Sequence, residues 1–334
     1  MSESRNYYPK ITVIGGGTGL PILLSGLKSA NCDLTAVVTV ADDGGSSGKL
    51  RSALNTIPPG DLRNCLVALS DSDRLYKDVF QYRFAPEDQE FSGHAIGNLI
   101  IAALTEMRGS IYSALKLLSV AMAVKGRVLP ACEEPLILQA HYQEGDMIEG
   151  ETTIVEEKRP IQSVSVRLAN QSASDQRVKA GRGVVDAIMG ADMVVLGPGS
   201  LYTSILPNIV IPEIRQALQE TSATVVYICN IMTQLGETEG FSDADHLRVI
   251  NDHLQGHYVD ACLLNRTTVP YEYIENNEVL DYLVQVSHDR QALKDQEAEI
   301  IGWDFLNLKD SGGYHDKDKL VQALIQVYRD HHQH

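Results

Sequence analysis

Short apolar runs rich in β-branched residues recur along the chain, with segments of helical periodicity between them. The runs occupy residues 11–14, 34–40, 193–196, 224–230, 259–265 and 300–303. Strands that are apolar throughout are typical of a parallel sheet that is buried on both faces. The pattern predicts an α/β fold with a mainly parallel open sheet, helices on both faces, and residues 300–303 at one edge.

Apolar positions at helical spacing predict helices over residues 20–27, 61–83, 94–107, 111–123 and 317–331. Between residues 127 and 170 the pattern changes to short strands, around residue 128 and at 136–138, 152–155 and 163–168. Turn signals at Gly145-Asp146 and Glu149-Gly150 separate them. We therefore expect a single α/β domain over residues 8–334, with an inserted antiparallel β subdomain at 127–170.

Composition and charge limit the classes of function. The 334 residues carry a formal net charge of −16, which argues against a nucleic-acid partner held by a broad basic surface. No apolar run is long enough to span a bilayer, and residues 1–6 contain no apolar signal core, so we expect a cytoplasmic protein without a membrane span. The five cysteines are widely spaced and include no C-x-x-C pair, so they are expected to be free thiols.

A glycine cluster at residues 15–19 follows the first apolar run and precedes a helical segment. Strand, glycine loop and helix form the layout of a phosphate-binding unit, in which loop amides and the helix start face an anion. The cluster departs from the dinucleotide fingerprint G-x-G-x-x-G, because Leu20 stands where the pattern starting at Gly15 requires its third glycine. Residues 197–200 form a second candidate anion loop after a later strand.

Polar clusters follow other predicted strands or open predicted helices. Asp42 and Asp43 could bind ribose hydroxyls or Mg²⁺. Asp61 could cap the helix that follows it or contact a ligand, and it is one of two candidates for a catalytic base. The other is His94, because its position near a helix start predicts a lowered pKa and a neutral imidazole. A solvated turn and a structural histidine are the alternative interpretations.

Six sequence blocks occur between residues 11 and 245 in the order GGGTGL, ADDGGSSGKLR, PPGDLRNCL, GHAIGNL, GPGSLYTSILPN and NIMTQLGET. Together they resemble the signature blocks of the YvcK/CofD-like family, and two of them, DDGGSSGKLR and NIMTQLGET, resemble its gluconeogenesis factor branch. The other branch is the 2-phospho-L-lactate transferase of deazaflavin-cofactor biosynthesis. The resemblance implies a Rossmann-like fold with a nucleotide at the strand ends, and it gives no guide to the residues after about 245.

The clusters and the resemblance together predict one set of ligand-binding residues. These are Gly15, Gly16, Gly17, Thr18, Gly19, Asp42, Asp43, Gly44, Gly45, Ser46, Arg63, Asn64, Asn98, Gly197, Pro198, Gly199, Ser200, Tyr202, Thr203, Asn230, Thr233 and Gln234. Asp42 and Asp43 are also the candidate metal ligands. The resemblance implies a nucleotide diphosphate ligand, with a UDP-sugar favoured, NAD or a GDP-type nucleotide as alternatives, and Mg²⁺ as a candidate cofactor.

Three functions are compatible with these residues. The resemblance favours a UDP-sugar-binding regulatory protein, needed for growth on gluconeogenic carbon sources and for cell shape and wall homeostasis. The second function is a Mg²⁺-dependent phospholactyl transferase of the 2-phospho-L-lactate transferase type, with Asp61 or His94 as the base. The third is an NAD-binding protein. A homo-oligomer and a regulatory protein partner are also expected, and the glycine loops alone do not separate the three functions.

Overall fold

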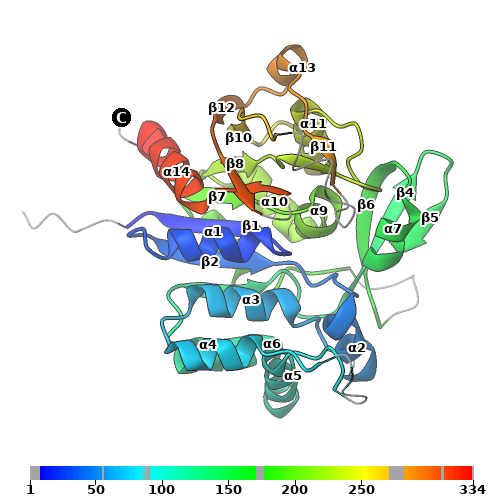
Figure 1. Cartoon of the computed structure of the whole chain (residues 1–334), viewed down its shortest axis with the longest axis vertical. Helices are drawn as coiled ribbons and strands as arrows, with labels where there is room; N and C mark the ends of the chain where they lie inside the picture. The colour runs from blue at the N-terminus through cyan, green and yellow to red at the C-terminus, as the bar shows by residue number, and fades with distance from the viewer. Residues whose placement is uncertain are drawn as a thin grey trace, which may run out of the picture.

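The computed structural model of the protein describes residues 8–54, 56–85, 87, 91–170, 177–270, 282–309 and 312–332. Its central sheet consists of β1 (Lys10–Gly15), β2 (Asp33–Val38), β3 (Arg127–Pro130), β7 (Met193–Leu196), β8 (Thr224–Ile228), β10 (Ala261–Asn265) and β12 (Glu299–Trp303). The strands lie in the order β12-β10-β8-β7-β1-β2-β3, and every neighbouring pair is parallel (Figure 1). The predicted parallel sheet, with residues 300–303 at its edge, is confirmed.

The direction of the chain reverses at the middle of this sheet. Ile14 of β1 lies beside Val37 of β2 on one side and beside Leu196 of β7 on the other. From β1 the chain moves outward through β2 to β3, and from β7 it moves the opposite way through β8 and β10 to β12. The sheet therefore has a topological switch point between β1 and β7, the place where open α/β sheets bind ligands.

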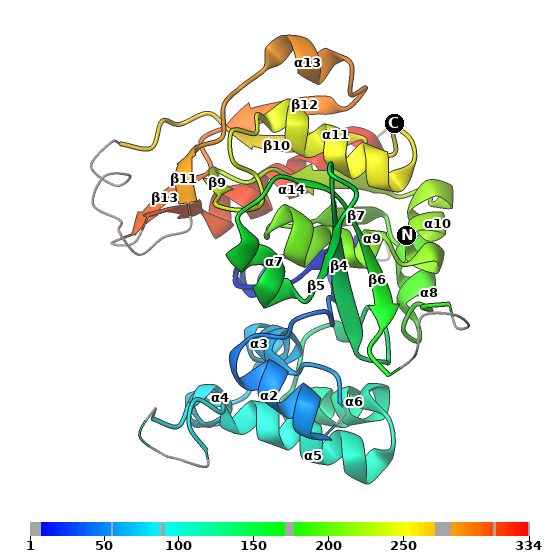
Figure 2. The same cartoon turned by 90° about the vertical axis from the view of Figure 1, so that its right-hand side faces the viewer.

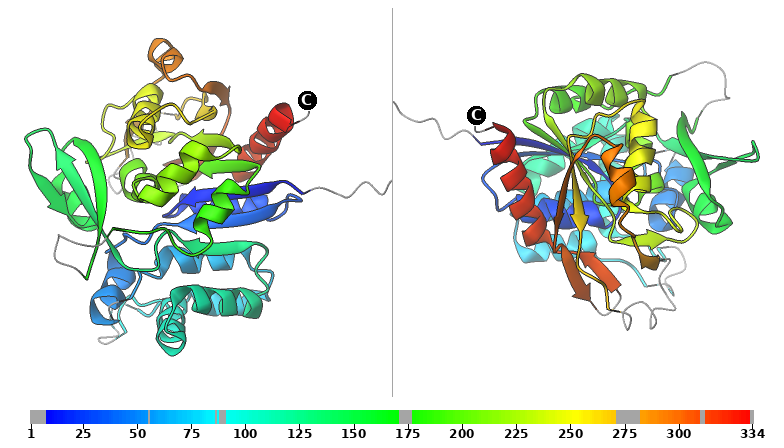
Figure 3. Two further views of the ribbon diagram at one scale, coloured as in Figure 1. Left: turned by 180° about the vertical axis from the view of Figure 1, so that it is seen from behind. Right: turned by 90° about the horizontal axis from the view of Figure 1, so that it is seen from above.

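Helices cover both faces of the sheet, as predicted (Figure 3). On one face α1 (Gly19–Leu27) packs against α3 (Gly60–Leu69) and α14 (Lys317–His332). On the other face α8 (Val184–Met189), α10 (Pro212–Glu220) and α11 (Asp243–Leu254) pack in series. Crossovers between parallel strands are right-handed, so the direction in which the chain moves along the sheet decides which face the connecting helix covers. The chain moves in opposite directions on the two sides of the switch point, and the helices therefore cover opposite faces.

The connection from β2 to β3 is largely helical and contains α2 (Gly45–Leu54), α3, α4 (Arg74–Gln81), α5 (Ile96–Arg108) and α6 (Ile111–Ala121) (Figure 2). The mainly helical segment predicted over residues 61–83 is confirmed, and it consists of two helices, because α3 ends at Leu69 before α4 begins. Ser70 adopts an extended conformation, and its hydroxyl donates to the carbonyl oxygen of Met122 at 2.7 Å. A tertiary hydrogen bond thus fixes a break that the local periodicity does not show.

An antiparallel sheet in the order β5-β4-β6 stands beside the main sheet (Figure 1). Its strands are β4 (Leu136–Tyr142), β5 (Met147–Glu149) and β6 (Ile161–Leu168). This confirms the predicted antiparallel insertion. The strand predicted around residue 128 instead belongs to the parallel sheet as β3, so the antiparallel part starts at Leu136.

The predicted strand at residues 152–155 is wrong, since these residues lie in the helix α7 (Glu151–Glu157). Their β-branched side chains favour a strand locally. However, Asp43 Oδ1 accepts hydrogen bonds from both the backbone N–H and the hydroxyl of Thr152, at 2.9 and 2.8 Å. A carboxylate far away in sequence therefore stabilises the first turn of α7 as a capping residue does.

One continuous apolar core joins the sheet, its helices and the antiparallel insertion, because Leu138, Ile154 and Val164 belong to the same buried cluster as Ile14 and Val195. The five cysteines are free, as predicted. No helix in the described ranges is long and apolar enough to cross a membrane. The remaining elements are η1 (Leu201–Ile205), α9 (Leu206–Ile209), β9 (Met232–Gln234), β11 (Tyr282–Gln285), α13 (Arg290–Lys294), β13 (Leu306–Lys309) and β14 (Gly312–His315).

Candidate functional site

The two predicted glycine loops meet at the switch point of the sheet. One follows β1 and the other follows β7, and these strands are direct neighbours. A Cβ atom on Gly19 would lie 2.8 Å from the carbonyl oxygen of Pro198, and a Cβ on Gly199 would lie 3.2 Å from that of Gly16. The backbones of the loops are therefore in contact, and only glycine permits this approach.

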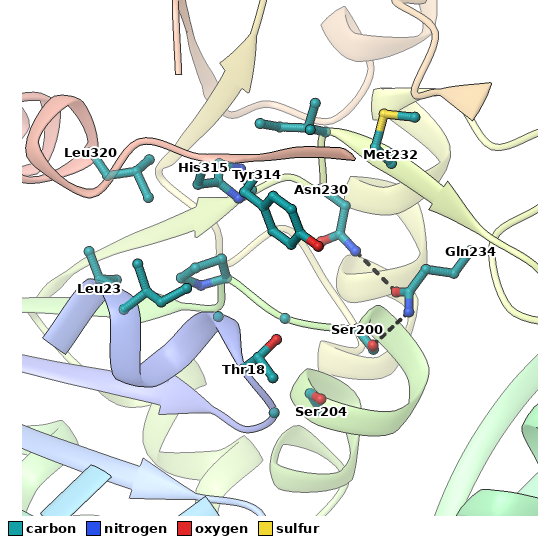
Figure 4. Close-up of a pocket in the computed structure, with 17 residues that line it drawn as sticks. Thr18, Leu23, Ser200, Ser204, Asn230, Met232, Gln234, Tyr314, His315 and Leu320 are labelled. Atoms are coloured by element: carbon teal, nitrogen blue, oxygen red, sulfur yellow. Dashed lines mark hydrogen bonds between the residues drawn. The ribbon is translucent and has the colours of Figure 1, made fainter. Parts of the chain in front are cut away.

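A pocket opens between these loops and the loop that follows β8 (Figure 4). Gln234 Nε2 donates to Ser200 Oγ at 2.8 Å, and Asn230 Nδ2 donates to Gln234 Oε1 at 3.3 Å. Thr18 and Ser204 also line the pocket. Asn230 Oδ1 is buried and has no hydrogen-bond partner among the described atoms. The structure thus brings five polar side chains from three separate loops to one pocket.

The C-terminal region completes the pocket, and the sequence analysis missed it. Tyr314 and His315 of β14 and Leu320 of α14 line the pocket, and the Tyr314 ring points toward Asn230 (Figure 4). The ring nitrogen His315 Nε2 donates to the carbonyl oxygen of Cys229 at 3.1 Å, and burial lowers the pKa of His315 to about 4. His315 is therefore neutral near pH 7. Nothing in the sequence analysis pointed to this segment, because only the fold brings it to the pocket.

Asp61 anchors the first glycine loop. Its Oδ2 atom accepts a hydrogen bond of 2.6 Å from the backbone N–H of Gly17, a residue with a φ of +64°. Residue 59 is the N-cap of α3 and makes no side-chain cap, so the interpretation of Asp61 as that helix's cap is wrong. Burial raises the pKa of Asp61 to about 6, and the Gly17 N–H opposes this shift.

The predicted pair Asp42 and Asp43 is joined by a third carboxyl group from the insertion. Asp42 Oδ1 accepts a hydrogen bond from the N–H of Gly44 at 2.8 Å, whereas Asp43 holds Thr152. Burial and the negative charge of Asp42 raise the pKa of Glu151 well above its ordinary value, and the two side chains share a hydrogen bond. The sequence analysis missed Glu151, because it lies in the segment expected to be a strand.

The two aspartates were predicted as metal ligands, and this remains a prediction. In the part of the chain that the structure describes, no three His, Cys, Asp or Glu side chains are arranged to hold a metal ion. Mg²⁺ is commonly bound by one or two carboxylates together with the phosphates of a substrate. The residues present fit this second arrangement only, in which the bound nucleotide supplies the missing oxygen ligands.

Several predicted residues form a hydrogen-bonded chain that begins at Arg63, two residues after Asp61 in α3. Arg63 donates to the side-chain oxygens of Asn98 and Asn64 at 3.1 and 2.8 Å. Asn98 Nδ2 donates to Ser46 Oγ at 3.1 Å, and Ser46 Oγ lies 3.0 Å from His94 Nδ1. None of these residues lines the pocket of Figure 4.

The pKa of His94 is lowered, as predicted. His94 lies two residues before the start of α5, so its predicted position near a helix start is confirmed. Burial is the first cause of the lowered pKa, followed by the positive charges of Lys49 and Arg83.

Three predicted residues are buried side chains that hold the fold around the pocket. The hydroxyl of Tyr202 donates to the carbonyl oxygen of Ile161 at 3.1 Å. Thr203 donates to Glu237 at 3.3 Å, and Thr233 donates to the carbonyl oxygen of Val284 at 3.1 Å. Their side chains therefore connect η1 and β9 to the insertion and to β11.

Comparisons with known proteins agree with this architecture. The family model described as 2-phospho-L-lactate transferase CofD matches residues 11–306. A curated relative from Lactococcus lactis, named "Putative gluconeogenesis factor", is 50% identical over 319 residues, covering 96% of this chain and 97% of the relative. A relative from Listeria innocua, named "Gluconeogenesis factor", is 44% identical over 324 residues, covering 97% of each chain.

The same architecture occurs in a solved structure. A crystal structure of a protein from Bacillus halodurans matches with a TM-score of 0.90 and 38% identity, covering 96% of this chain and 100% of that chain. The family model, the full-length relatives and the solved structure all support the family that the sequence blocks indicated. The chain therefore belongs to the YvcK/CofD-like family and, within it, to the gluconeogenesis factor type.

Proposed function

We propose that this protein binds a nucleoside-diphosphate sugar, of the UDP-sugar class, in the pocket between its two glycine loops. In this proposal the bound state regulates growth on gluconeogenic carbon sources and the homeostasis of cell shape and wall. The observation that carries the binding proposal is the backbone contact between the loops at Gly19 and Pro198. Two anion-binding loops that close on one point suit a diphosphate better than a single phosphate.

The remaining walls of the pocket suit the two ends of such a ligand. Asn230 and Gln234 offer amide donors and acceptors for a base or a sugar hydroxyl, and Asn230 Oδ1 still lacks a partner within the described residues. The Tyr314 ring offers a flat apolar surface for stacking. A regulatory protein requires only this complementarity, since its output is a change in the population of states when the ligand binds.

Thermal unfolding with a ligand panel tests the proposal. We expect UDP-N-acetylglucosamine and UDP-glucose to raise the unfolding temperature, because a ligand at 100 times its Kd stabilises by about 2.7 kcal/mol. NAD and GDP, measured with and without Mg²⁺, distinguish the alternatives. If GDP stabilises the protein and the UDP-sugars do not, the proposal is contradicted and the transferase is favoured. If NAD alone stabilises it, the third function, an NAD-binding protein, is favoured.

A transferase is the second candidate, and the carboxyl groups beside the first glycine loop favour it. Asp42 and Glu151 share a hydrogen bond although both are acids, and the charge of Asp61 acts on Glu151 as well. A bound Mg²⁺ would neutralise charge on a transferring phosphoryl group. Asp42 and Asp43 would hold the ion, and Asp61, which keeps Gly17 in place, would orient the loop that carries the phosphates.

Asp42→Asn should remove the Mg²⁺-dependent part of ligand binding and leave the Mg²⁺-free part within about twofold, because one of two carboxylate ligands is lost. Isothermal titration with each nucleotide, with and without Mg²⁺, measures both parts. Asp33→Asn is the matched control, since Asp33 lies at the exposed opposite end of the same strand, β2. Equal Mg²⁺ dependence in Asp42→Asn and the control would exclude Asp42 as a metal ligand.

A further inference from the structure

Three helices begin around the hydrogen-bonded chain of Arg63, Asn98 and Ser46. Ser46 lies in the first turn of α2, Arg63 in the first turn of α3 and Asn98 in the first turn of α5. The residues before α3 and α5 make no side-chain caps. The first N–H groups of α3 and α5 donate to Ser47 Oγ and to the carbonyl oxygen of Tyr82. Each helix start still carries a partial positive charge, so three of them together favour a negative group nearby.

The Arg63 guanidinium is buried there and makes no ion pair within the described residues, although the charge of Asp61 acts on it from a greater distance. Its side chain is 5% exposed, and it donates to the neutral amides of Asn98 and Asn64. Its Nε has no partner among the described atoms. Burial and the charge of Arg83 lower the pKa of Arg63 to about 10, still far above neutral pH, so the group stays charged. Buried arginines are normally paired with an anion.

Two further cations border the same place. Lys49 donates to the carbonyl oxygen of Ser92 at 3.3 Å, and Arg83 donates to that of Gly93 at 2.5 Å. Within the described residues no carboxylate lies within ion-pair distance of Lys49, Arg63 or Arg83, although the whole chain carries a net charge of −16. Within the described ranges, these three cations therefore gather without an ion-pair partner.

We infer that Ser46, Lys49, Arg63, Arg83 and His94 form a binding site for the phosphate group of a second small-molecule ligand. We call these five residues the basic cluster. A tetrahedral oxyanion accepts several hydrogen bonds at once, and the basic cluster offers a hydroxyl, an imidazole and three cations. The site is separate from the pocket of Figure 4, because none of the five residues lines that pocket. The inference does not depend on which nucleotide the pocket binds.

A purely structural role explains only part of the geometry. Arg63 does tie α3 to α5, and a Cβ on Gly97 would lie 2.8 Å from Arg63 Cδ, so the helices are fitted around this side chain. That role accounts for the bond to Asn98. It does not account for Lys49 and Arg83, which come from two other segments and bring further positive charge to the edge of the same network.

The His94 imidazole reports directly on the basic cluster, since Lys49 and Arg83 both lower its pKa. A phosphate bound beside it would partly cancel these charges and raise the pKa of His94. The experiment is an NMR pH titration of the histidine ring signals, with His94 assigned by His94→Gln, in inorganic phosphate and in sodium chloride of equal ionic strength. We expect phosphate to raise the pKa of His94 by about half a unit or more.

The variant Lys49→Gln combined with Arg83→Gln should abolish the phosphate response, and both side chains are exposed, so folding should be kept. Arg108→Gln removes the same kind of exposed charge from the far end of α5 and should leave the response unchanged. The response should also persist when UDP saturates the pocket. An unchanged His94 pKa in phosphate, or an equal response in the double variant, would overturn the inference.

Loss of the response in UDP would also overturn it, because phosphate would then act through the glycine loops alone. Failure of the nucleotide proposal gives a different result. In that case UDP-sugars produce no thermal shift, while the phosphate response at His94 is retained. The two proposals can therefore fail independently.

Discussion

Gly19→Ala should reduce the affinity for the pocket ligand at least tenfold, which corresponds to about 1.4 kcal/mol of binding free energy. Gly15→Ala should leave the affinity within about twofold of wild type. The added Cβ at Gly19 would lie 2.8 Å from Pro198 O and 3.1 Å from Pro198 C, both backbone atoms of the second loop. Neither can rotate away, so the loops must separate. Titration calorimetry with UDP-N-acetylglucosamine measures the affinity.

Gly15→Ala is the matched control, because a Cβ there would have its nearest neighbour at 3.8 Å, an ordinary contact. Stability provides a second measurement. Gly19 is the first residue of α1, where alanine would normally gain about 1 kcal/mol over glycine, yet overpacking typically costs about 1–3 kcal/mol. A Gly19→Ala variant that is more stable than wild type and binds normally would show that the loops are not in contact in solution.

Asp61→Ala should weaken ligand binding by about tenfold and destabilise the fold, whereas Asp61→Asn should bind nearly as wild type does. Asp61 holds the N–H of Gly17 at 2.6 Å, and the alanine variant leaves that donor without its acceptor. A hydrogen bond to a charged group contributes about 1.5–3 kcal/mol. The asparagine oxygen can still accept this bond. Equal binding by the two variants would show that the Gly17 contact does not position the loop.

The pH dependence of stability tests the buried state of Asp61 separately. Its pKa is raised from 3.8 to about 6 in the folded protein, so between these pH values the folded chain keeps a proton that the unfolded chain has lost. The contribution of Asp61 to stability is therefore present at low pH and is lost as the pH rises through about 6. Asparagine has no proton to lose.

We accordingly expect the stability of Asp61→Asn relative to wild type to rise by about 2–3 kcal/mol between pH 4 and pH 7, measured by urea unfolding. Glu151 is present in both proteins, so its pH-dependent contribution to the free energy of unfolding largely cancels when the two are compared. Asp33→Asn, at an exposed position, should show no such trend. If the difference in unfolding free energy between Asp61→Asn and wild type does not change with pH, Asp61 is not desolvated in the folded state.

Much of the fold could be predicted from the chain because its strands are extreme in composition. β7, β8 and β10 are buried at every residue, so each reads as a continuous apolar run that only a covered parallel sheet explains. The failures fall where a distant contact overrides local preference. Residues 152–155 have the composition of a strand, but Asp43 caps them as a helix. Ser70 ends α3 through a hydrogen bond to residue 122.

The candidate site divides in the same way. Both glycine loops could be recognised in the sequence, because a backbone that approaches an anion or another backbone requires glycine wherever it occurs. Tyr314 and Glu151 could not be recognised, because their roles depend on which segments the tertiary structure brings to them. The same is true of the separation of Ser46 and Arg63 from the pocket, since the sequence analysis placed these two residues in one set with the pocket residues.

The sequence by itself determined the class of sheet, the family, and the two loops that are built to approach an anion. These properties depend on short segments of the chain, namely runs of apolar residues and clusters of glycine. Only the tertiary structure decided that β1 and β7 are neighbours and that a C-terminal hairpin closes the pocket. It also decided that Asp61 contacts the pocket loop at Gly17 while its charge acts on Arg63 of the basic cluster. The physical reason is that hydrogen bonds, charge and burial act through space, and the order of residues along the chain does not encode these distances explicitly.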